Sequence, residues 1–240
     1  MSGALIRGFV GMMTNDPQQF KKRVVPAILI PLAGVLAATA LLLFSLKPAL
    51  LEHFLEGADT PYAVIEAYYK WYEALSAVSI GGTVLVLICG GAGVLIGRKS
   101  AAAVLCAVCI SVLGALACGA MGAGEDIPAL KTQAREDMAQ IENARLETEE
   151  VRFREEREAS GLPGPYAEEQ PTMFTVYRGI GEAAGWKDYY IPDSLGFAPD
   201  EAGYYDENKS LDWNDENARL YSLTYTANFR VVISIEPVNN

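Results

Sequence analysis

The fold is decided by residues 76–123, which read SAVSIGGTVLVLICGGAGVLIG (76–97), RKS (98–100) and AAAVLCAVCISVLGALACGAMGA (101–123). Neither apolar run contains a charged residue, and each is longer than 20 residues. About 20 apolar residues in a helix cross a hydrocarbon core of about 30 Å. Because only a short basic turn separates the two runs, residues 76–123 are predicted to form an antiparallel transmembrane hairpin.

A third apolar run, residues 24–46, follows directly on a short leader, residues 1–23, that ends in Lys21, Lys22 and Arg23. The run is too long for the apolar part of a signal peptide, and no small-x-small cleavage site follows it. We therefore expect an uncleaved anchor. The fold class predicted is a membrane protein, mainly α, with three transmembrane helices.

The charges of the connecting segments predict an orientation. The leader carries four basic residues and the turn at 98–99 two more, whereas residues 47–73 carry five acidic residues and two lysines. Lysine and arginine concentrate on the cytoplasmic side of membrane proteins. We expect an integral protein of a plasma or inner membrane, with a cytoplasmic amino terminus and an extracytoplasmic carboxyl terminus.

The region after the spans is strongly acidic. Residues 124–240 contain 24 acidic and 11 basic residues, a net charge of −13, whereas the other 123 residues sum to +2. This balance argues against a nucleic-acid partner and against docking flat on an anionic bilayer. The expected partners are the lipid bilayer and either another membrane or extracytoplasmic protein or a second copy of the chain.

The segment between the first two spans, residues 47–75, is predicted to be an extracytoplasmic loop with two short amphipathic helices. Aromatic residues gather before the second span, and we interpret them as an interfacial belt, since such rings are apolar with a polar tip. An aromatic ligand pocket is the alternative. The aromatic residues are Tyr68, Tyr69, Trp71 and Tyr72.

Small residues recur every four positions along the second and third spans, which lets two helix backbones approach closely in lipid. We expect the hairpin to use these faces, with an oligomer interface as the alternative. No Asp, Glu, Lys, Arg or His lies within the spans, which argues against a proton-coupled transporter. The predicted helix-packing residues are Gly93, Gly97, Ala107, Ser111, Ala115 and Gly119.

The rest of the chain falls into three predicted segments. Residues 124–160 are rich in Ala, Glu, Arg and Leu, with opposite charges four residues apart, and are predicted to be a long polar helical stalk. Residues 161–170 contain the helix-breaking sequence GLPGP and are read as a linker. Residues 171–240 are predicted to form a small β-rich or α+β extracytoplasmic domain, with strands at 173–177, 219–226 and 229–236.

The chemical inventory favours no enzyme. Residues 124–240 contain no histidine or cysteine, so neither a Ser-His-Asp nor a Cys-His arrangement nor the usual zinc site can be assembled there. Oxygen ligands alternate as in a calcium loop, although Leu211 stands where that loop needs glycine and Asn217 where it needs glutamate. We expect no cofactor, with calcium as the alternative, at Asp206, Asn208, Ser210 and Asp212.

Two functions remain open from the sequence. The first is a membrane-anchored interaction or scaffold protein, an accessory subunit that presents an acidic extracytoplasmic domain to a protein partner. The second is a passive subunit of an oligomeric pore or transporter complex. The spans contain no charged residue that could help to line a pore, and a pore does not need the predicted stalk, so both features favour the first.

Overall fold

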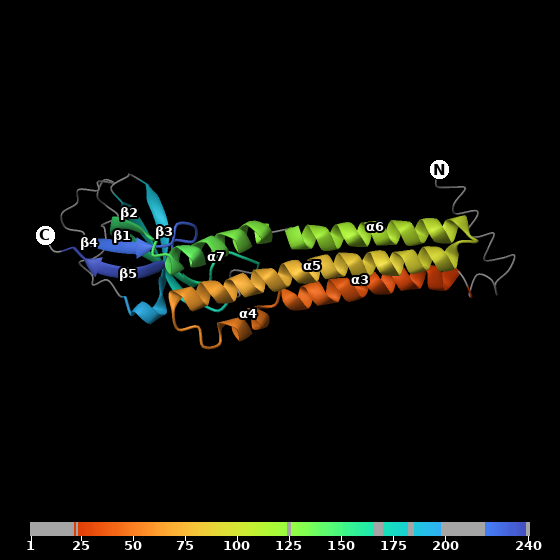
Figure 1. Cartoon of the computed structure of the whole chain (residues 1–240), viewed down its shortest axis with the longest axis horizontal. Coiled ribbons are helices and arrows are strands. Elements are labelled where there is room, and N and C mark those ends of the chain that lie inside the picture. The colour runs from red at the N-terminus through yellow and green to blue at the C-terminus, as the bar shows by residue number, and fades with distance from the viewer. Residues whose placement is uncertain are drawn as a thin grey trace. The chain divides into compact units, whose positions relative to one another are not determined.

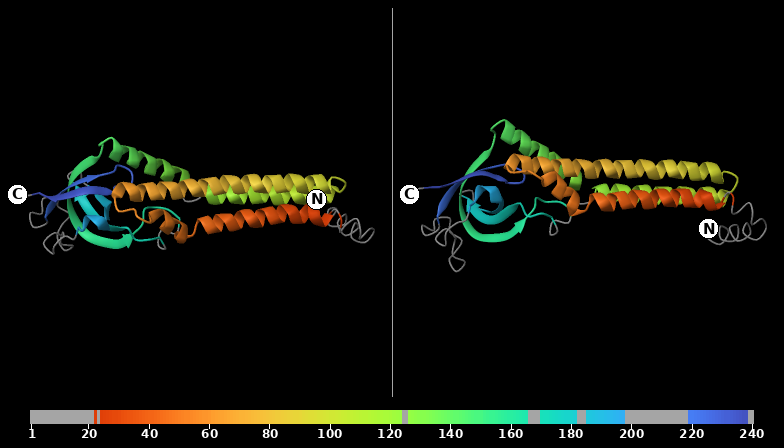
Figure 2. Two further views of the ribbon diagram at one scale, coloured as in Figure 1. Left: turned by 60° about the horizontal axis from the view of Figure 1, so that its bottom comes forward. Right: turned by 90° about the horizontal axis from the view of Figure 1, so that it is seen from below.

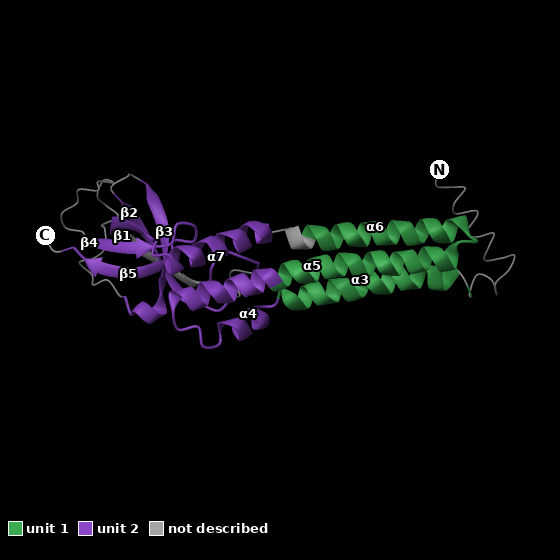
Figure 3. Ribbon diagram, viewed as in Figure 1, with its two compact units in different colours: residues 1–46, 74–124 green, residues 47–73, 125–240 purple. Residues whose placement is uncertain are grey.

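The computed structural model describes residues 22, 24–123, 126–165, 170–181, 185–197 and 219–238. The chain is mostly helical with a carboxyl-terminal antiparallel sheet, and it forms two compact units (Figure 3). Unit 1 comprises residues 1–46 and 74–124, and unit 2 comprises residues 47–73 and 125–240. Most of the leader and all four calcium candidates, Asp206, Asn208, Ser210 and Asp212, lie outside the described residues.

Unit 1 contains three helices that are long and apolar enough to cross a membrane: α3 (Val25–Ser45), the end of α5 (Pro61–Gly97) and α6 (Ala101–Ala123) (Figure 1). The three predicted apolar helices are thus confirmed. Helix α5 begins 15 residues before the predicted second span, because after Pro61 no proline or glycine interrupts the sequence until Gly81. The Thr60 side chain and carbonyl accept the first free N–H groups of α5, from Ala63 and Val64.

Close approach at glycines holds these helices together. A Cβ atom at Gly93 would lie 2.6 Å from the Ala27 carbonyl oxygen, and one at Gly114 would lie 2.3 Å from a Val35 methyl group. Between α5 and α6, a Cβ atom at Gly90 would collide with Ser111. Small residues therefore pack all three helices together, including α3, and not only the predicted hairpin.

Unit 2 contains the short helix α4 (Pro48–Leu55), residues 61–73 of α5, helix α7 (Ile127–Glu142) and a five-stranded sheet. The predicted helical stalk, residues 124–160, is wrong beyond α7. The helix ends at Glu142, Ala144 adopts a left-handed backbone conformation (φ +52°), and residues 147–160 form a 14-residue strand. Pairing with strands on both sides overrides the helical preference of these Glu- and Arg-rich residues.

The strands are β1 (Glu147–Ser160), β2 (Phe174–Gly181), β3 (Trp186–Pro192), β4 (Leu220–Tyr225) and β5 (Val232–Pro237). Their order is β3-β2-β1-β4-β5, and every ladder is antiparallel. A parallel bridge joins Tyr190 of β3 to Val231, just before β5. The sheet therefore curls into a partly open barrel (Figure 2).

The long strand β1 makes this curvature possible. Its first half pairs with β4 and its second half with β2, and irregularities interrupt the β1–β2 register after Phe153 and after Glu156. Such bulges increase the bend of a strand. The barrel core consists mainly of inward-facing aromatic and branched residues: Val151, Phe153, Tyr177, Tyr189, Ile191, Tyr221, Leu223, Tyr225 and Val232.

Candidate functional site

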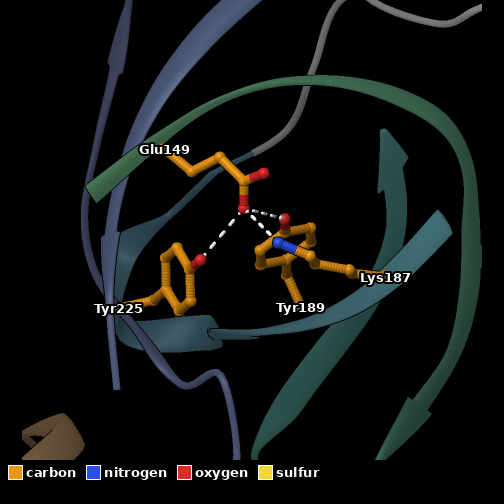
Figure 4. Close-up of polar contacts among 4 residues, drawn as sticks. All are labelled: Glu149, Lys187, Tyr189 and Tyr225. Carbon is orange, nitrogen blue, oxygen red and sulfur yellow. Dashed lines mark hydrogen bonds and ion pairs between the residues drawn. The ribbon is translucent and has the colours of Figure 1, made fainter. Parts of the chain in front are cut away.

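A glutamate cluster lies among the barrel strands and joins three of them (Figure 4). One carboxylate oxygen of Glu149, on β1, accepts hydrogen bonds from the Lys187 ammonium at 2.7 Å, the Tyr225 hydroxyl at 2.9 Å and the Tyr189 hydroxyl at 3.1 Å. The donors come from β3 and β4, neither of which borders the other in the sheet. We call these four residues the Glu149 cluster.

The alternation of β1 explains the inward position of this acid. Val151 and Phe153 face the barrel core, and Glu149 occupies the same face two residues earlier. The Glu149 side chain is only 14% exposed, whereas that of Lys187 is 32% exposed. Gly181, which pairs with Val151, has no side chain, and a Cβ atom there would lie 1.9 Å from the second Glu149 oxygen. Glycine at 181 therefore leaves the room that the carboxylate occupies.

The surroundings shift the pKa values of Glu149, Tyr189 and Tyr225. Burial opposes ionisation of Glu149, but hydrogen bonds from Lys187, Tyr225 and Tyr189 outweigh it and lower the pKa of the carboxyl. Burial and the adjacent carboxylate raise the pKa of both tyrosine hydroxyls. An efficient general acid or base needs a pKa near the working pH. Because the shifts here move away from neutrality, the geometry favours a cross-link between strands over proton transfer.

A second polar contact joins α7 to the turn between β4 and β5. Asp137 is fully buried and accepts the backbone N–H of Asn228 at 3.1 Å, the Asn228 side-chain amide at 2.8 Å and the backbone N–H of Phe229 at 2.9 Å. Gln140, one turn later, accepts the N–H of Ala227 at 2.8 Å. The helix thereby satisfies the donors of a turn that would otherwise be buried unpaired.

The aromatic residues predicted at a lipid interface lie elsewhere. Tyr68, Trp71 and Tyr72 are fully buried inside unit 2, where protein and not lipid covers them. Only Tyr69 is partly exposed, with the Lys131 ammonium 5.7 Å from its ring centre. The three buried rings pack against the predicted linker, because helix α5 carries them into the folded unit.

The linker is held there by hydrogen bonds. The Tyr68 hydroxyl donates to the Gln170 side chain at 3.1 Å, and the Tyr72 hydroxyl donates to the Pro163 carbonyl. A Cβ atom at Gly164 would lie 3.2 Å from the Trp71 ring. The segment after β1 is therefore a packed part of unit 2 and not a free connection.

These contacts bear on binding. The described part of the β1–β2 connection packs on α5, and the β4–β5 turn is held by Asp137 of α7. Both loops thus make contacts within the chain, and the fold alone assigns no ligand.

The predicted helix-packing residues divide into two groups. Gly93, Gly97, Ala107 and Ser111 lie at helix contacts or are buried, and Ala115 is partly buried against a small core of Ala38, Leu42, Val86 and Cys118. Gly119 is exposed, and nothing lies within 4 Å of its added Cβ position. The reason is that four residues turn a helix by 400°, so a strict four-residue stripe rotates away from the contact.

Among the residues that the structure describes, no group of three His, Cys, Asp or Glu side chains could hold a metal ion. The sequence prediction missed Glu149 and Asp137, because each lies in a run where acids are common. The available signal was the two-residue spacing of Glu149, Val151 and Phe153, which is typical of a strand face. No family model, curated protein or solved structure matches the chain.

Proposed function

We propose that this protein is a membrane-anchored interaction or scaffold protein whose unit 1 lies in a bilayer and whose unit 2 presents an acidic barrel domain to a protein partner. One contrast carries the proposal. Among the described residues, every large apolar side chain that remains strongly exposed lies on the long helices of unit 1, between Leu29 and Leu116. Unit 2 holds 29 of the 30 acidic residues.

The polar side chains of unit 1 support burial in lipid. The Ser79 hydroxyl donates to the Cys118 carbonyl at 2.9 Å, and the Ser111 hydroxyl to the Ala107 carbonyl at 2.7 Å. A hydroxyl without a partner is costly in hydrocarbon. Since these hydroxyl groups are satisfied within the bundle, the outer surface can remain apolar.

The orientation rests on charge. Lys22, Arg98 and Lys99 are exposed and lie at one end of the three-helix bundle, where Gly97 packs against Ala27 at the start of α3 and Ala103 at the start of α6. Basic residues at one end favour a cytoplasmic location for that end. Unit 2 then lies on the extracytoplasmic side.

Cysteine labelling tests this orientation. We expect Glu136→Cys to react with a membrane-impermeant maleimide added to intact cells, and Lys99→Cys to react only after permeabilisation. The four native cysteines all lie in the apolar helices, so the unmodified chain serves as a low-background control. Labelling of Lys99→Cys alone in intact cells would reverse the assignment.

A protein partner is favoured over a reaction by the chemistry of unit 2. Its net charge is −16, from 29 acidic and 13 basic residues, which favours a basic partner surface. In the Glu149 cluster the pKa of the carboxyl is lowered and those of both tyrosine hydroxyls are raised, and the described parts of two barrel loops make contacts within the chain. An accessory subunit that binds through the acidic domain is consistent with each of these features.

The alternative function, a passive subunit of an oligomeric pore or transporter, draws support from unused small residues. Nothing lies within 4 Å of an added Cβ at Gly81, Gly91 or Gly119, so another helix could approach there. A water-filled pore needs a polar lining, and residues 76–97 and 101–123 contain no charge. The scaffold is therefore the preferred function.

The deciding experiment measures the mass of the detergent-purified full-length protein by light scattering, together with co-purification from native membranes. We expect a monomer that retains a defined partner at low salt and loses it as salt is raised, because the attraction is electrostatic. A closed homo-oligomer without a partner would refute the scaffold and support the pore.

A further inference from the structure

Strand β5 is paired along one side only, among the described residues. It pairs with β4 from Val232 to Pro237, whereas its contact with β3 is limited to the bridge between Tyr190 and Val231. There the Tyr190 N–H donates to the Arg230 carbonyl at 3.0 Å. Past this bridge, the side of β5 that faces away from β4 pairs with no other described strand, and we call it the open edge.

The open edge has a local cause in β3. This strand ends at Pro192, which has no N–H to donate, and the 3-10 helix Asp193–Leu195 follows at once. Gly196 then takes a left-handed conformation (φ +59°). Since β3 and β5 run parallel, the end of β3 leaves the later residues of β5 with no paired strand on that side among the described residues.

The hydrogen-bond pattern identifies the groups at this edge. The Val238 N–H donates to the Leu220 carbonyl at 2.9 Å. In an antiparallel ladder, bonded pairs alternate with non-bonded pairs, so Glu236 and Ser234 also bond to β4. The N–H and carbonyl of Ile235 consequently face the open edge. The side chain of Ile235 packs partly against the barrel core, whereas Ser234 and Glu236 are exposed.

We propose that the partner of unit 2 docks by strand addition: an extended segment that carries lysine or arginine pairs with β5 at Ile235. This inference rests on the proposed function and specifies its binding mode. Strand addition uses the backbone groups for affinity and the alternating side chains for specificity. Charge selects the occupant, because unit 2 carries −16 and Glu236 lies on the edge itself.

A second copy of the chain is disfavoured by the same charge. Two β5 edges paired with each other would bring two Glu236 side chains and two units of −16 together. Charged residues and proline at an edge are common protections against self-pairing, and Glu236 and Pro237 supply both. A short basic strand from another protein has no such repulsion.

The first test measures amide hydrogen exchange of full-length protein in detergent, alone and with the synthetic peptide acetyl-Lys-Val-Lys-Val-Lys-Val-amide. Alone, the Ile235 amide should exchange rapidly while those of Ser234 and Glu236 are protected by the β4 ladder. The peptide should slow exchange at Ile235 by about tenfold or more. The inference would be overturned if the Ile235 amide were already protected without the peptide, or if the peptide left its exchange rate unchanged.

The second test uses two variants that separate edge pairing from packing. Ile235→Pro removes the outward N–H, whereas Ile235→Val keeps it and changes the side chain slightly. The proline variant should lose at least about tenfold in affinity for the peptide, equivalent to one lost hydrogen bond, and the valine variant should not. Tryptophan fluorescence of both proteins checks that unit 2 remains folded. Equal affinities in two folded variants would contradict strand addition.

A photocrosslinking amino acid in place of Ser234, with one in place of Glu136 as control, then separates this inference from the proposed function. Cross-linking at 234 to a Lys- or Arg-bearing segment supports it. Cross-linking of a partner only at 136 would refute docking at the β5 edge and leave the scaffold proposal standing. A second copy of the chain cross-linked at 234 would refute the basic segment of another protein as the occupant of the edge. No cross-link at either position and no co-purified protein would refute both.

Discussion

The Glu149 cluster offers the sharpest test of the fold, through the substitution Glu149→Gln. Glutamine has nearly the same shape and keeps one acceptor oxygen, so the change removes the negative charge and little else. Three donors from two other strands lose a charged acceptor. If the cluster cross-links the barrel, unit 2 should lose stability without losing its fold.

The magnitude follows from the contacts. A hydrogen bond to a charged group contributes about 1.5–3 kcal/mol, against about 0.5–1.5 kcal/mol for a neutral pair, so each bond loses about 1 kcal/mol. Lys187 is 32% exposed and its share is screened by solvent. We expect a total loss of about 2 kcal/mol. For a unit of this size that corresponds to a fall of roughly 6–10 °C in melting temperature.

The assay is thermal and urea unfolding of full-length protein in detergent, followed by tryptophan fluorescence. All three tryptophans, Trp71, Trp186 and Trp213, belong to unit 2, so the signal reports that unit. Glu150→Gln is the matched control, because Glu150, the next residue of β1, is exposed and faces away from the core. If the free energy of unfolding of Glu149→Gln lies within about 0.5 kcal/mol of that of Glu150→Gln, the Glu149 cluster does not cross-link the barrel.

Three further outcomes are expected. Because folding lowers the pKa of Glu149, its contribution is present above the ordinary value near 4.5 and is lost as the pH falls through the folded value, so melting curves of wild type and Glu149→Gln should converge as the pH is lowered below that ordinary value. Asp137→Ala leaves buried turn N–H groups unpaired and should cost about 3 kcal/mol by the same fluorescence assay, with the exposed Arg135→Ala as control. Gly93→Ala should destabilise the helices of unit 1 by about 1–3 kcal/mol in detergent, measured by circular dichroism, whereas Gly91→Ala, which meets open space, should not. Equal effects within either control pair would contradict the packing described.

The long apolar helices were predictable because length and absence of charge are properties of the sequence alone. The contacts between these helices were less predictable. The four-residue repeat includes Gly93 and Ser111, which lie at helix contacts, but it also includes Gly119, which has nothing within 4 Å of its added Cβ position. Nothing in the first span's composition indicated that Gly34 would meet Cys89 of α5. Such pairings depend on the relative rotation of whole helices, which local sequence does not encode.

The aromatic residues before the second span illustrate a different limit. Tyr68, Trp71 and Tyr72 have the composition of a lipid interface, and the same amphipathic rings serve equally well in a core where their polar tips find partners. Tyr68 and Tyr72 find theirs about 90 to 100 residues later, at Gln170 and Pro163. Composition could not distinguish the two environments, because the choice depends on a distant segment.

Strand β1 shows why the site and the principal misreading coincide. Among the side chains of β1 that the structure describes, the apolar inward face carries only Val151 and Phe153, because the position that would begin the apolar alternation is Glu149. An inward acid breaks the strand pattern and leaves charge pairs four residues apart, which indicate a helix. Local rules fail most often where a residue serves a special role. The Glu149 carboxylate that hides the strand pattern is also the group that joins β1, β3 and β4. Assigning residues 147–160 to a strand therefore places Glu149 on the inward face and reveals the cluster that the sequence prediction missed.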